Sequence, residues 1–285
     1  MFIHLLAADG KDLEFVTVQV PGKVKVGPKC DYIIISRSEV APDADGNFLP
    51  ENFNERERDA IHTYAAARLT ITLWEQAIKQ KIIWPWLQEG LLGPMKIERY
   101  NELVDAAYYQ RFRSIELGTT GPSLKFTCRS FDIVSHETTH AIIRAINPRV
   151  YDDATLETYA CVEALCDISA FLTLAFQPAI LDLAIHRTNG DLSAKNFLSE
   201  FAEGYSKDPC DGIRSALVIR NIPDDPCAMG SPLIKLVYEL LVQLVQDSQK
   251  SAQDGVRNLS TKLFGLAAKS RDFQLNTFYR ALSKI

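Results

Sequence analysis

FDIVSHETTHAIIRAI, residues 131–146, carries two histidines four positions apart among apolar residues, and Asn147-Pro148 follows it directly. The apolar residues recur at helical spacing, so this segment is predicted to be a helix that ends before the proline. In a helix, positions four apart lie on one face, about 6 Å apart along the axis. His136 and His140 can therefore reach one zinc ion, and Glu137 beside them can act as a general base toward a water that the metal activates.

A catalytic zinc site needs a third protein ligand and keeps a fourth position open. A histidine six residues after His140 is excluded, because Ile146 stands there. Glu163 lies among apolar neighbours in the next predicted helix, where an unpaired carboxylate would be costly, and we predict it as the third ligand. Asp167, one helical turn later, can accept a hydrogen bond from a zinc-bound imidazole and fix its tautomer. The alternative for both acids is a solvated helix face.

The composition limits the classes of partner. The chain has 285 residues, 47% of them hydrophobic, and a formal net charge of −5, which gives no electrostatic reason to expect a nucleic-acid partner. The N-terminus does not resemble a secretion signal, and we expect no run that approaches the roughly 20 apolar residues needed to span a bilayer. We therefore expect a cytoplasmic protein with no membrane partner. Its cysteines are predicted to be reduced, with Cys161 and Cys166 as small core residues rather than ligands.

The order of the predicted elements indicates an α+β fold. Short alternating runs at 15–20 and 32–36 predict strands, and a long amphipathic helix follows from residue 55 to about 81. His62 in this helix is predicted to be solvated. Residues 95–118 return to strand-like composition. Later helices are predicted near 131–146, 155–185, 193–204, 231–247 and 253–284. Strands first and helices later are typical of the α+β class.

These residues resemble the gluzincin metallopeptidases, in particular thermolysin-like enzymes. The resemblance is carried by SHETTHAI at 135–142, by Glu163 with Asp167, and by Asp105-Ala106-Ala107-Tyr108. It implies a zincin, thermolysin-like fold. An N-terminal sheet-and-helix lobe would span residues 1–146, a mainly helical lobe would span 147–285, and the active-site cleft would lie between them.

The resemblance also implies roles for residues outside the histidine helix. Asp105 and Ala106 would belong to an edge strand that pairs with substrate main chain, although the family commonly has asparagine at the position of Asp105. Weaker similarity extends to residues 212–216, where Arg214 would grip a substrate carbonyl oxygen. An exposed surface arginine is the alternative.

The main difference from the family lies in the groups that donate hydrogen bonds to the developing oxyanion. Cys227 stands where the family has a histidine that donates to the developing oxyanion, and a thiol is a weak donor. Tyr151 is the nearest candidate to share that role, with Tyr159 and Tyr109 as alternatives.

Three functions follow from these observations. The first is a zinc-dependent, peptidase-like hydrolase acting on a peptide substrate. The second is a zinc enzyme of another class that acts on a small amide or ester. The third is a catalytically impaired homologue that serves as a binding protein. The sequence does not specify an oligomeric state.

Overall fold

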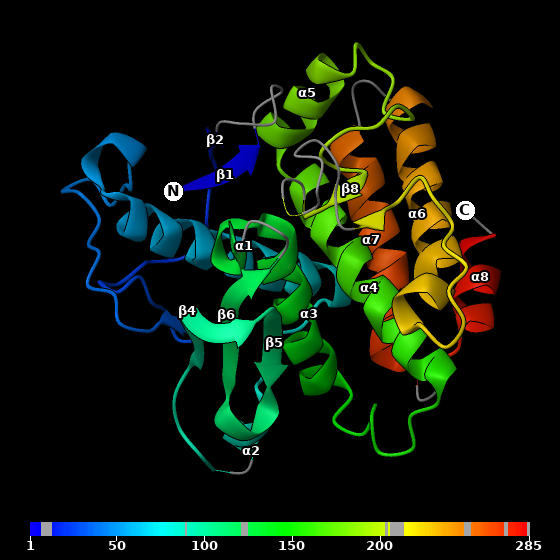
Figure 1. The fold of residues 1–285 in the computed structure, drawn as a ribbon, viewed down its shortest axis with the longest axis horizontal. Coiled ribbons are helices and arrows are strands. Elements are labelled where there is room, and N and C mark those ends of the chain that lie inside the picture. Colours follow the sequence, from blue (N-terminus) through cyan, green and yellow to red (C-terminus); the bar gives the residue numbers. More distant parts are fainter. Residues whose placement is uncertain are drawn as a thin grey trace.

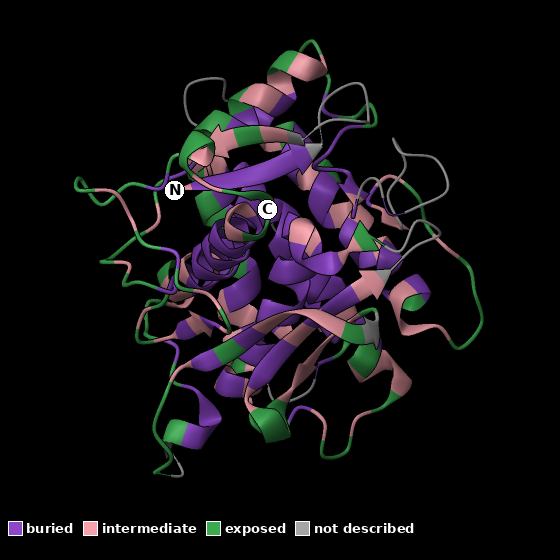
Figure 2. Cartoon of the chain, turned by 60° about the vertical axis from the view of Figure 1, so that its left-hand side comes forward, coloured by how far each residue is buried: buried purple, intermediate pink, exposed green. Residues whose placement is uncertain are grey.

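A curled sheet and a set of long helices make up the chain, a mixed arrangement compatible with the predicted α+β class (Figure 1). The structure is a computed structural model. It describes residues 1–6, 13–88, 90–120, 125–202, 205, 214–247, 252–270 and 273–283. Buried residues gather on the central helices and on the faces of the strands that pack against them (Figure 2).

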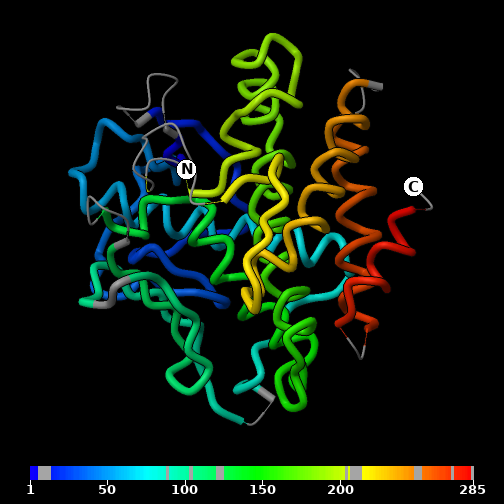
Figure 3. The backbone as a smooth tube through the Cα atoms, turned by 45° about the vertical axis from the view of Figure 1, so that its right-hand side comes forward, coloured from blue at the N-terminus to red at the C-terminus, as the bar shows by residue number. Residues whose placement is uncertain are grey.

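The helices form most of the fold. They are α1 (Glu55–Ile78), α2 (Pro85–Gln88), α3 (Phe131–Ile146), α4 (Leu156–Ala175), α5 (Pro178–Arg187), α6 (Pro226–Asp247), α7 (Ala252–Lys269) and α8 (Leu275–Leu282), with 3-10 turns η1 (Pro50–Asn52), η2 (Gln110–Phe112) and η3 (Thr127–Arg129). In space, α4, α6, α7 and α8 pack side by side (Figure 3).

The strands fall into three groups. They are β1 (Phe2–Leu6), β2 (Leu13–Thr17), β3 (Ile33–Ile35), β4 (Met95–Val104), β5 (Ala106–Tyr109), β6 (Ser114–Thr120), β7 (Lys125–Phe126), β8 (Glu200–Phe201) and β9 (Arg214–Ser215). The main sheet has the order β3-β4-β6-β5, with β7 paired to β6. In the described part of the chain β5 is the last strand of this sheet and pairs with β6 alone, and it also packs against α3.

Helix α3 is fixed at both ends and along one side. The Ser130 hydroxyl accepts a hydrogen bond from the Ile133 amide and caps the N-terminus. Inside the protein, the Thr139 hydroxyl donates to Ser169 of α4 over 2.8 Å, and the Trp74 indole of α1 donates to the same Ser169 oxygen over 2.9 Å. These buried bonds set the rotation of α3 between its two neighbouring helices.

The predicted helix at 193–204 is wrong. Residues 193–202 form turns and β8, while 203 and 204 lie outside the described residues. Its Asn196 side chain donates to the backbone carbonyls of Leu192 and Ala194 and accepts from the Leu198 amide. An asparagine that satisfies nearby backbone groups in this way competes with the helical ladder.

Two other predicted helices are each divided. The segment 155–185 breaks into α4 and α5 at Gln177-Pro178, because proline has no amide proton to continue the ladder. The segment 253–284 divides into α7 and α8. Helix α6 begins at Pro226, earlier than the predicted 231, and β1 was not predicted at all.

His62 is fully buried, so its prediction as a solvated residue is wrong. Its ring stacks on His4 of β1 with centroids 4.4 Å apart, and its Nδ1 accepts the His4 amide over 2.8 Å. Both His4 ring nitrogens and the His62 Nε2 are buried and have no hydrogen-bond partner within the described part of the chain. Sequence periodicity missed this burial because the covering residues come from the distant β1–β2 hairpin.

Two helices are long and apolar enough to cross a bilayer by length and composition alone, contrary to the expectation that no such run exists. They are α4, whose apolar window is 83% buried, and Pro226–Gln246 within α6, which is 56% buried. Core helices that are mostly buried also meet these two criteria. The absence of a membrane partner stays a prediction, as does the division into lobes at residue 146.

The buried histidine pair predicts a stability that depends on pH. Burial lowers the pKa of His4 from 6.5 to about 3, helped by the nearby Arg129 and Arg58 charges, and burial also lowers the pKa of His62. Below pH 6.5 the unfolded chain therefore binds protons that the folded chain does not. Folding stability is full above pH 6.5, and His4 alone removes about 1.4 kcal/mol per pH unit as pH falls toward 3.

We expect His4→Phe to flatten the plot of unfolding free energy against pH between 6.5 and 4, as measured by urea denaturation. His186→Gln at the end of α5 is the matched control and should keep the wild-type slope. Parallel curves for wild type and His4→Phe would contradict this account.

Candidate metal centre

Two imidazoles and one carboxylate converge between α3 and α4. The Nε2 atoms of His136 and His140 lie 3.1 Å apart. The Glu163 carboxylate oxygens lie 3.2 Å from His136 Nε2 and 3.4 Å from His140 Nε2. Ligands of a tetrahedral zinc ion with bonds of about 2.0–2.1 Å are separated by about 3.3 Å. The three observed distances therefore match the ligand separations of one tetrahedral ion.

The partners of the outer ring nitrogens orient both imidazoles. His136 Nδ1 lies 2.8 Å from Asp167 Oδ1, and His140 Nδ1 lies 3.2 Å from the Tyr151 hydroxyl. When each Nδ1–H donates to its partner, each Nε2 keeps a lone pair free for a metal. Asp167 thus occupies the place that the sequence predicted for it.

Arg214 lies behind His136 and balances the charge of Asp167. Its Nε and Nη2 donate to the two Asp167 oxygens over 2.8 and 2.7 Å, and its guanidinium lies over the Phe201 ring at 4.3 Å. The Arg214 side chain is only 18% exposed, so the alternative of an exposed surface arginine is wrong. The segment 212–216 is the one in which the sequence shows weaker similarity to the gluzincins. Its residues 212 and 213 lie outside the described residues.

Cys166 is also near the two imidazoles. The ligand atoms of His136, His140 and Cys166 lie within 4.8 Å of one another, and this buried group could hold a metal ion. Cys166 is fully buried, as predicted for a core residue, but it lies closer to the two imidazoles than the prediction that it is not a ligand implied. Its position three residues after Glu163 could have indicated this closeness, because residues three apart share a helix face.

Glu163 is the better third ligand of the two. Burial raises the pKa of the Cys166 thiol well above 9, and the nearby Glu163 and Glu137 charges add to this shift. Burial opposes the charge on Glu163, but the His136 hydrogen bond and the nearby His136, His140 and Arg214 charges together outweigh it, so the pKa of Glu163 is lowered. The carboxylate is thus charged before any metal arrives, whereas the thiol must first lose a proton.

A cavity of about 580 Å³ opens over these groups and is lined by most of the predicted site residues. Those residues are Asp105, Ala106, His136, Glu137, His140, Tyr151, Glu163, Arg214 and Cys227. Asp167 does not line it, since it lies behind His136. Of the alternative tyrosines, Tyr159 is part of the lining and Tyr109 is not. The residues that the sequence predicted for the site thus line one cavity, although they come from separate segments of the chain.

Glu137 is a buried carboxyl aimed at this cavity from α3. Burial raises its pKa to about 7, while the His136 charge and a backbone hydrogen bond from Tyr108 of β5 favour the ionised form. The bond to Tyr108 joins the carboxylate to the free edge of the sheet. At the start of β5, Asp105 has a φ of 116°, a region that favours glycine, and strain of this kind is typical of functional sites.

Cys227, at the start of α6, faces Glu163. Its Sγ lies 3.5 Å from Glu163 Oε2 and 3.9 Å from Arg214 Nη1. Burial raises the pKa of the thiol to about 12, partly offset by Arg214, so it remains protonated. The thiol proton is directed at a carboxylate and is not available to a substrate oxygen.

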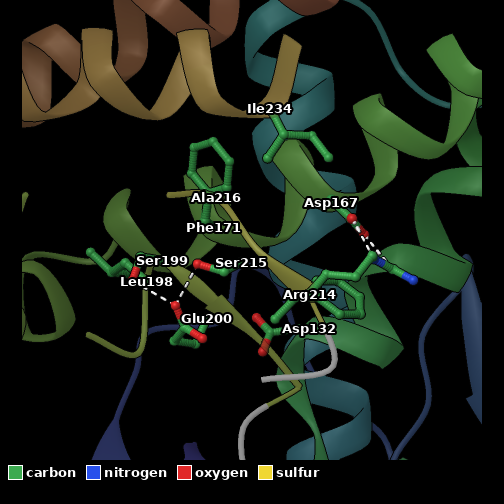
Figure 4. A pocket seen from close by; sticks show the side chains of 11 residues that line it. Asp132, Asp167, Phe171, Leu198, Ser199, Glu200, Arg214, Ser215, Ala216 and Ile234 are labelled. Carbon is green, nitrogen blue, oxygen red and sulfur yellow. Dashed lines mark hydrogen bonds and ion pairs between the residues drawn. The ribbon is translucent and has the colours of Figure 1, made fainter. Parts of the chain in front are cut away.

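A second, smaller cavity of about 20 Å³ lies on the far side of Arg214, with room for about one water molecule (Figure 4). Glu200 enters it and accepts hydrogen bonds from Ser215 over 2.6 Å and from Ser199 over 3.4 Å. Asp132 lies on the same side of Arg214 and accepts the Ala202 amide over 3.0 Å. These polar groups line the cavity together with Arg214.

Phe201 and Tyr108 are site residues that sequence reasoning missed. Phe201 contacts the His136 ring with centroids 5.5 Å apart and comes from β8, in the segment predicted to be a helix. No local pattern marks it, because its place depends on the pairing of β8 with β9. Tyr108 was quoted within the edge-strand motif, but its backbone contact with Glu137 depends on the packing of β5 against α3.

Comparison with known proteins finds no protein-family profile and no curated protein that matches this sequence.

The geometry predicts that Asp167 tunes metal affinity through His136. We expect Asp167→Asn to keep the fold and weaken zinc binding about 10- to 100-fold, because the amide no longer holds a charge beside the imidazole. Competition with a chromophoric chelator measures the dissociation constant. Asp182→Asn on the exposed face of α5 is the control, and equal affinities in the two variants would contradict the role of Asp167.

Proposed function

We propose that the chain is a zinc-dependent hydrolase of the gluzincin type that cleaves peptide bonds. The observation that carries the proposal is the triangle of His136 Nε2, His140 Nε2 and the Glu163 carboxylate, with sides of 3.1–3.4 Å. Glu137 lies beside this triangle and is not one of its corners. A purely structural metal site has no use for such an uncoordinated carboxylate.

We also propose a thermolysin-like fold for the surroundings of the site. Three features support it: α3 carries both histidines, the next long helix carries Glu163 and Asp167, and the edge strand β5 packs against α3. The cavity is bordered by β5, α3, α4 and the start of α6, which is where a cleft between two lobes would lie.

Zinc fits the donor set, because two imidazoles and one carboxylate leave the fourth corner of a tetrahedron open. A bound zinc ion would supply Lewis acidity and lower the pKa of water at that corner. His136, His140 and Glu163 would hold it. Glu137 accepts the proton of the attacking water on its carboxylate and passes it to the leaving amide nitrogen. The raised pKa of Glu137, about 7, suits a group that must both take and return a proton near neutrality.

The chain's own donors position the substrate. An extended peptide pairs with the free edge of β5 near Ala106 and Tyr108, as a further strand of the sheet. Arg214 uses Nε and Nη2 for Asp167, so its Nη1, whose contact is a 3.9 Å approach to Cys227 Sγ, is the nitrogen that would bind a substrate carbonyl. Asp167 therefore orients both a metal ligand and a substrate-binding residue.

Tyr151 is the oxyanion donor that the site supports best. If His140 Nδ1–H donates to the Tyr151 oxygen, the phenolic proton is free to donate into the cavity. Cys227 cannot replace the missing histidine, because its thiol faces Glu163. Loss of one such donor costs about 3–4 kcal/mol of transition-state stabilisation. We therefore expect slow peptide hydrolysis.

The same observation favours a second candidate, a zinc enzyme that acts on a small amide or ester. An activated ester needs less stabilisation of its oxyanion than a peptide, so loss of one donor harms its hydrolysis less. A higher kcat/KM for small esters and amides than for any member of a peptide library would favour this candidate.

Two variants of the site should both lose activity but differ in whether they keep zinc. Glu137→Gln should keep one zinc per chain but lower kcat/KM on peptides about 10²- to 10⁴-fold, because only the general base is lost. Glu163→Ala should lose zinc as well as activity. Elemental analysis and a peptide-library digest of the purified full-length chain measure both.

Glu157→Gln, at the start of the same helix as Glu163, is the control for a change on α4, because the amide keeps an acceptor for the Leu275 amide. Undiminished hydrolysis by both site variants would end the proposal of a zinc hydrolase.

A further inference from the structure

A second groove lies at the far end of β5 and carries two arginines. Its volume is about 520 Å³, and it is lined by Pro85, Trp86, Leu91, Gln110, Arg111 and Arg113, which we call the arginine groove. One wall comes from α2 and the residues after it, and the other comes from η2 and the turn into β6. Figure 1 shows α2 next to the connection between β5 and β6.

The walls of the groove are held in place. Trp86 stacks on Trp84 with centroids 5.6 Å apart and donates its indole proton to the Gly93 carbonyl over 3.1 Å. Gln110 Oε1 accepts from Arg144 Nε over 2.6 Å, which ties η2 to α3. The groove is therefore attached to the same helix that carries the two histidines.

The groove is both basic and apolar. Among the described residues, neither Arg111 nor Arg113 forms an ion pair with a carboxylate, and Arg113 Nη1 donates to the Leu92 carbonyl over 3.5 Å. Beside them, Leu92 is 87% exposed and Phe112 is 60% exposed. Unpaired positive charge within a chain of net charge −5, next to exposed apolar groups, is complementary to an acidic ligand with apolar neighbours.

The groove follows the candidate metal centre along the chain. Asp105 to Tyr108 line the large cavity, and shortly after them Gln110, Arg111 and Arg113 line the groove. A strand advances about 3.4 Å per residue, so a chain paired with β5 passes from Tyr108 to Arg111 within about three residues. Antiparallel pairing directs the N-terminal part of that chain toward the groove.

We infer that the arginine groove binds an acidic residue of an extended polypeptide substrate, about three to five residues before the scissile bond. This inference rests on the proposed function, since it needs the substrate to lie along β5 with its scissile bond at the metal centre. The groove then selects substrates whose acidic residue lies at that distance, and it raises the affinity for them without touching the reacting atoms.

Fluorogenic peptides that are identical around the scissile bond test this inference. They carry Glu, Gln or Lys at the third, fourth or fifth residue before it. With the zinc-loaded full-length protein, the best Glu peptide should show about tenfold higher kcat/KM than its Lys counterpart, through KM. The double variant Arg111→Glu with Arg113→Glu should reverse the preference.

Lys262→Glu with Arg280→Glu is the matched control, because it makes the same change in net charge on α7 and α8 and should leave the preference intact. Equal kcat/KM for Glu and Lys peptides, or a preference that survives the Arg111 and Arg113 variant, overturns the inference while the proposed function stands.

If no peptide is cleaved, a binding measurement distinguishes the proposal for the arginine groove from the proposed function. Fluorescence anisotropy of the same labelled peptides with Glu137→Gln protein measures binding without turnover. Preferential binding of Glu peptides that is lost in the Arg111 and Arg113 variant supports recognition of acidic peptides by the groove, even where the wild-type protein cleaves no peptide and the proposed function falls. Binding of acidic peptides that never changes the cleavage of any substrate assigns the groove to a separate partner and overturns its role in substrate selection.

Discussion

The spacing of His136 and His140 is useful only because α3 and α4 are held at one rotation to each other. Ser169 of α4 accepts protons from both Thr139 of α3 and Trp74 of α1 in the buried interior. Leaving such buried donors unpaired would cost about 1–3 kcal/mol each, so the three helices are constrained together. With that rotation, the face of α3 that carries the imidazoles meets the face of α4 that carries Glu163 and Asp167.

Charge balance is the second constraint on this arrangement. Glu137, Glu163 and Asp167 are carboxyl groups in or behind one cavity, and burial disfavours the charge on each. Arg214 compensates Asp167 through two hydrogen bonds, and Glu200 and Asp132 line a small cavity together with that arginine. A divalent cation among His136, His140 and Glu163 would compensate the remaining negative charge of the carboxylates. Polar groups gathered at this density are typical of a site kept for function at a cost in stability.

Local patterns were enough to predict the histidine helix and the carboxylates that meet it. Positions one helical turn apart stay together whatever the rest of the chain does, so His136 with His140 and Glu163 with Asp167 could be paired from spacing alone. Contacts between distant segments could not be predicted in this way. Phe201 reaches the site through a strand pair, His62 is buried by the N-terminal hairpin, and Asn196 ends a predicted helix with its own side chain. Cys166 was missed although its spacing from Glu163 was informative, because it was compared only with Cys161.

The coordination of the metal tests the central claim most directly, since Glu163 and Cys166 offer chemically different third ligands on one helix face. X-ray absorption at the zinc K edge of the zinc-loaded full-length protein measures the ligand atoms and their distances. The account predicts two imidazole nitrogens and oxygen ligands at about 2.0–2.2 Å, with no sulfur. A zinc–sulfur distance of about 2.3 Å, or a chain that retains no zinc, would contradict it.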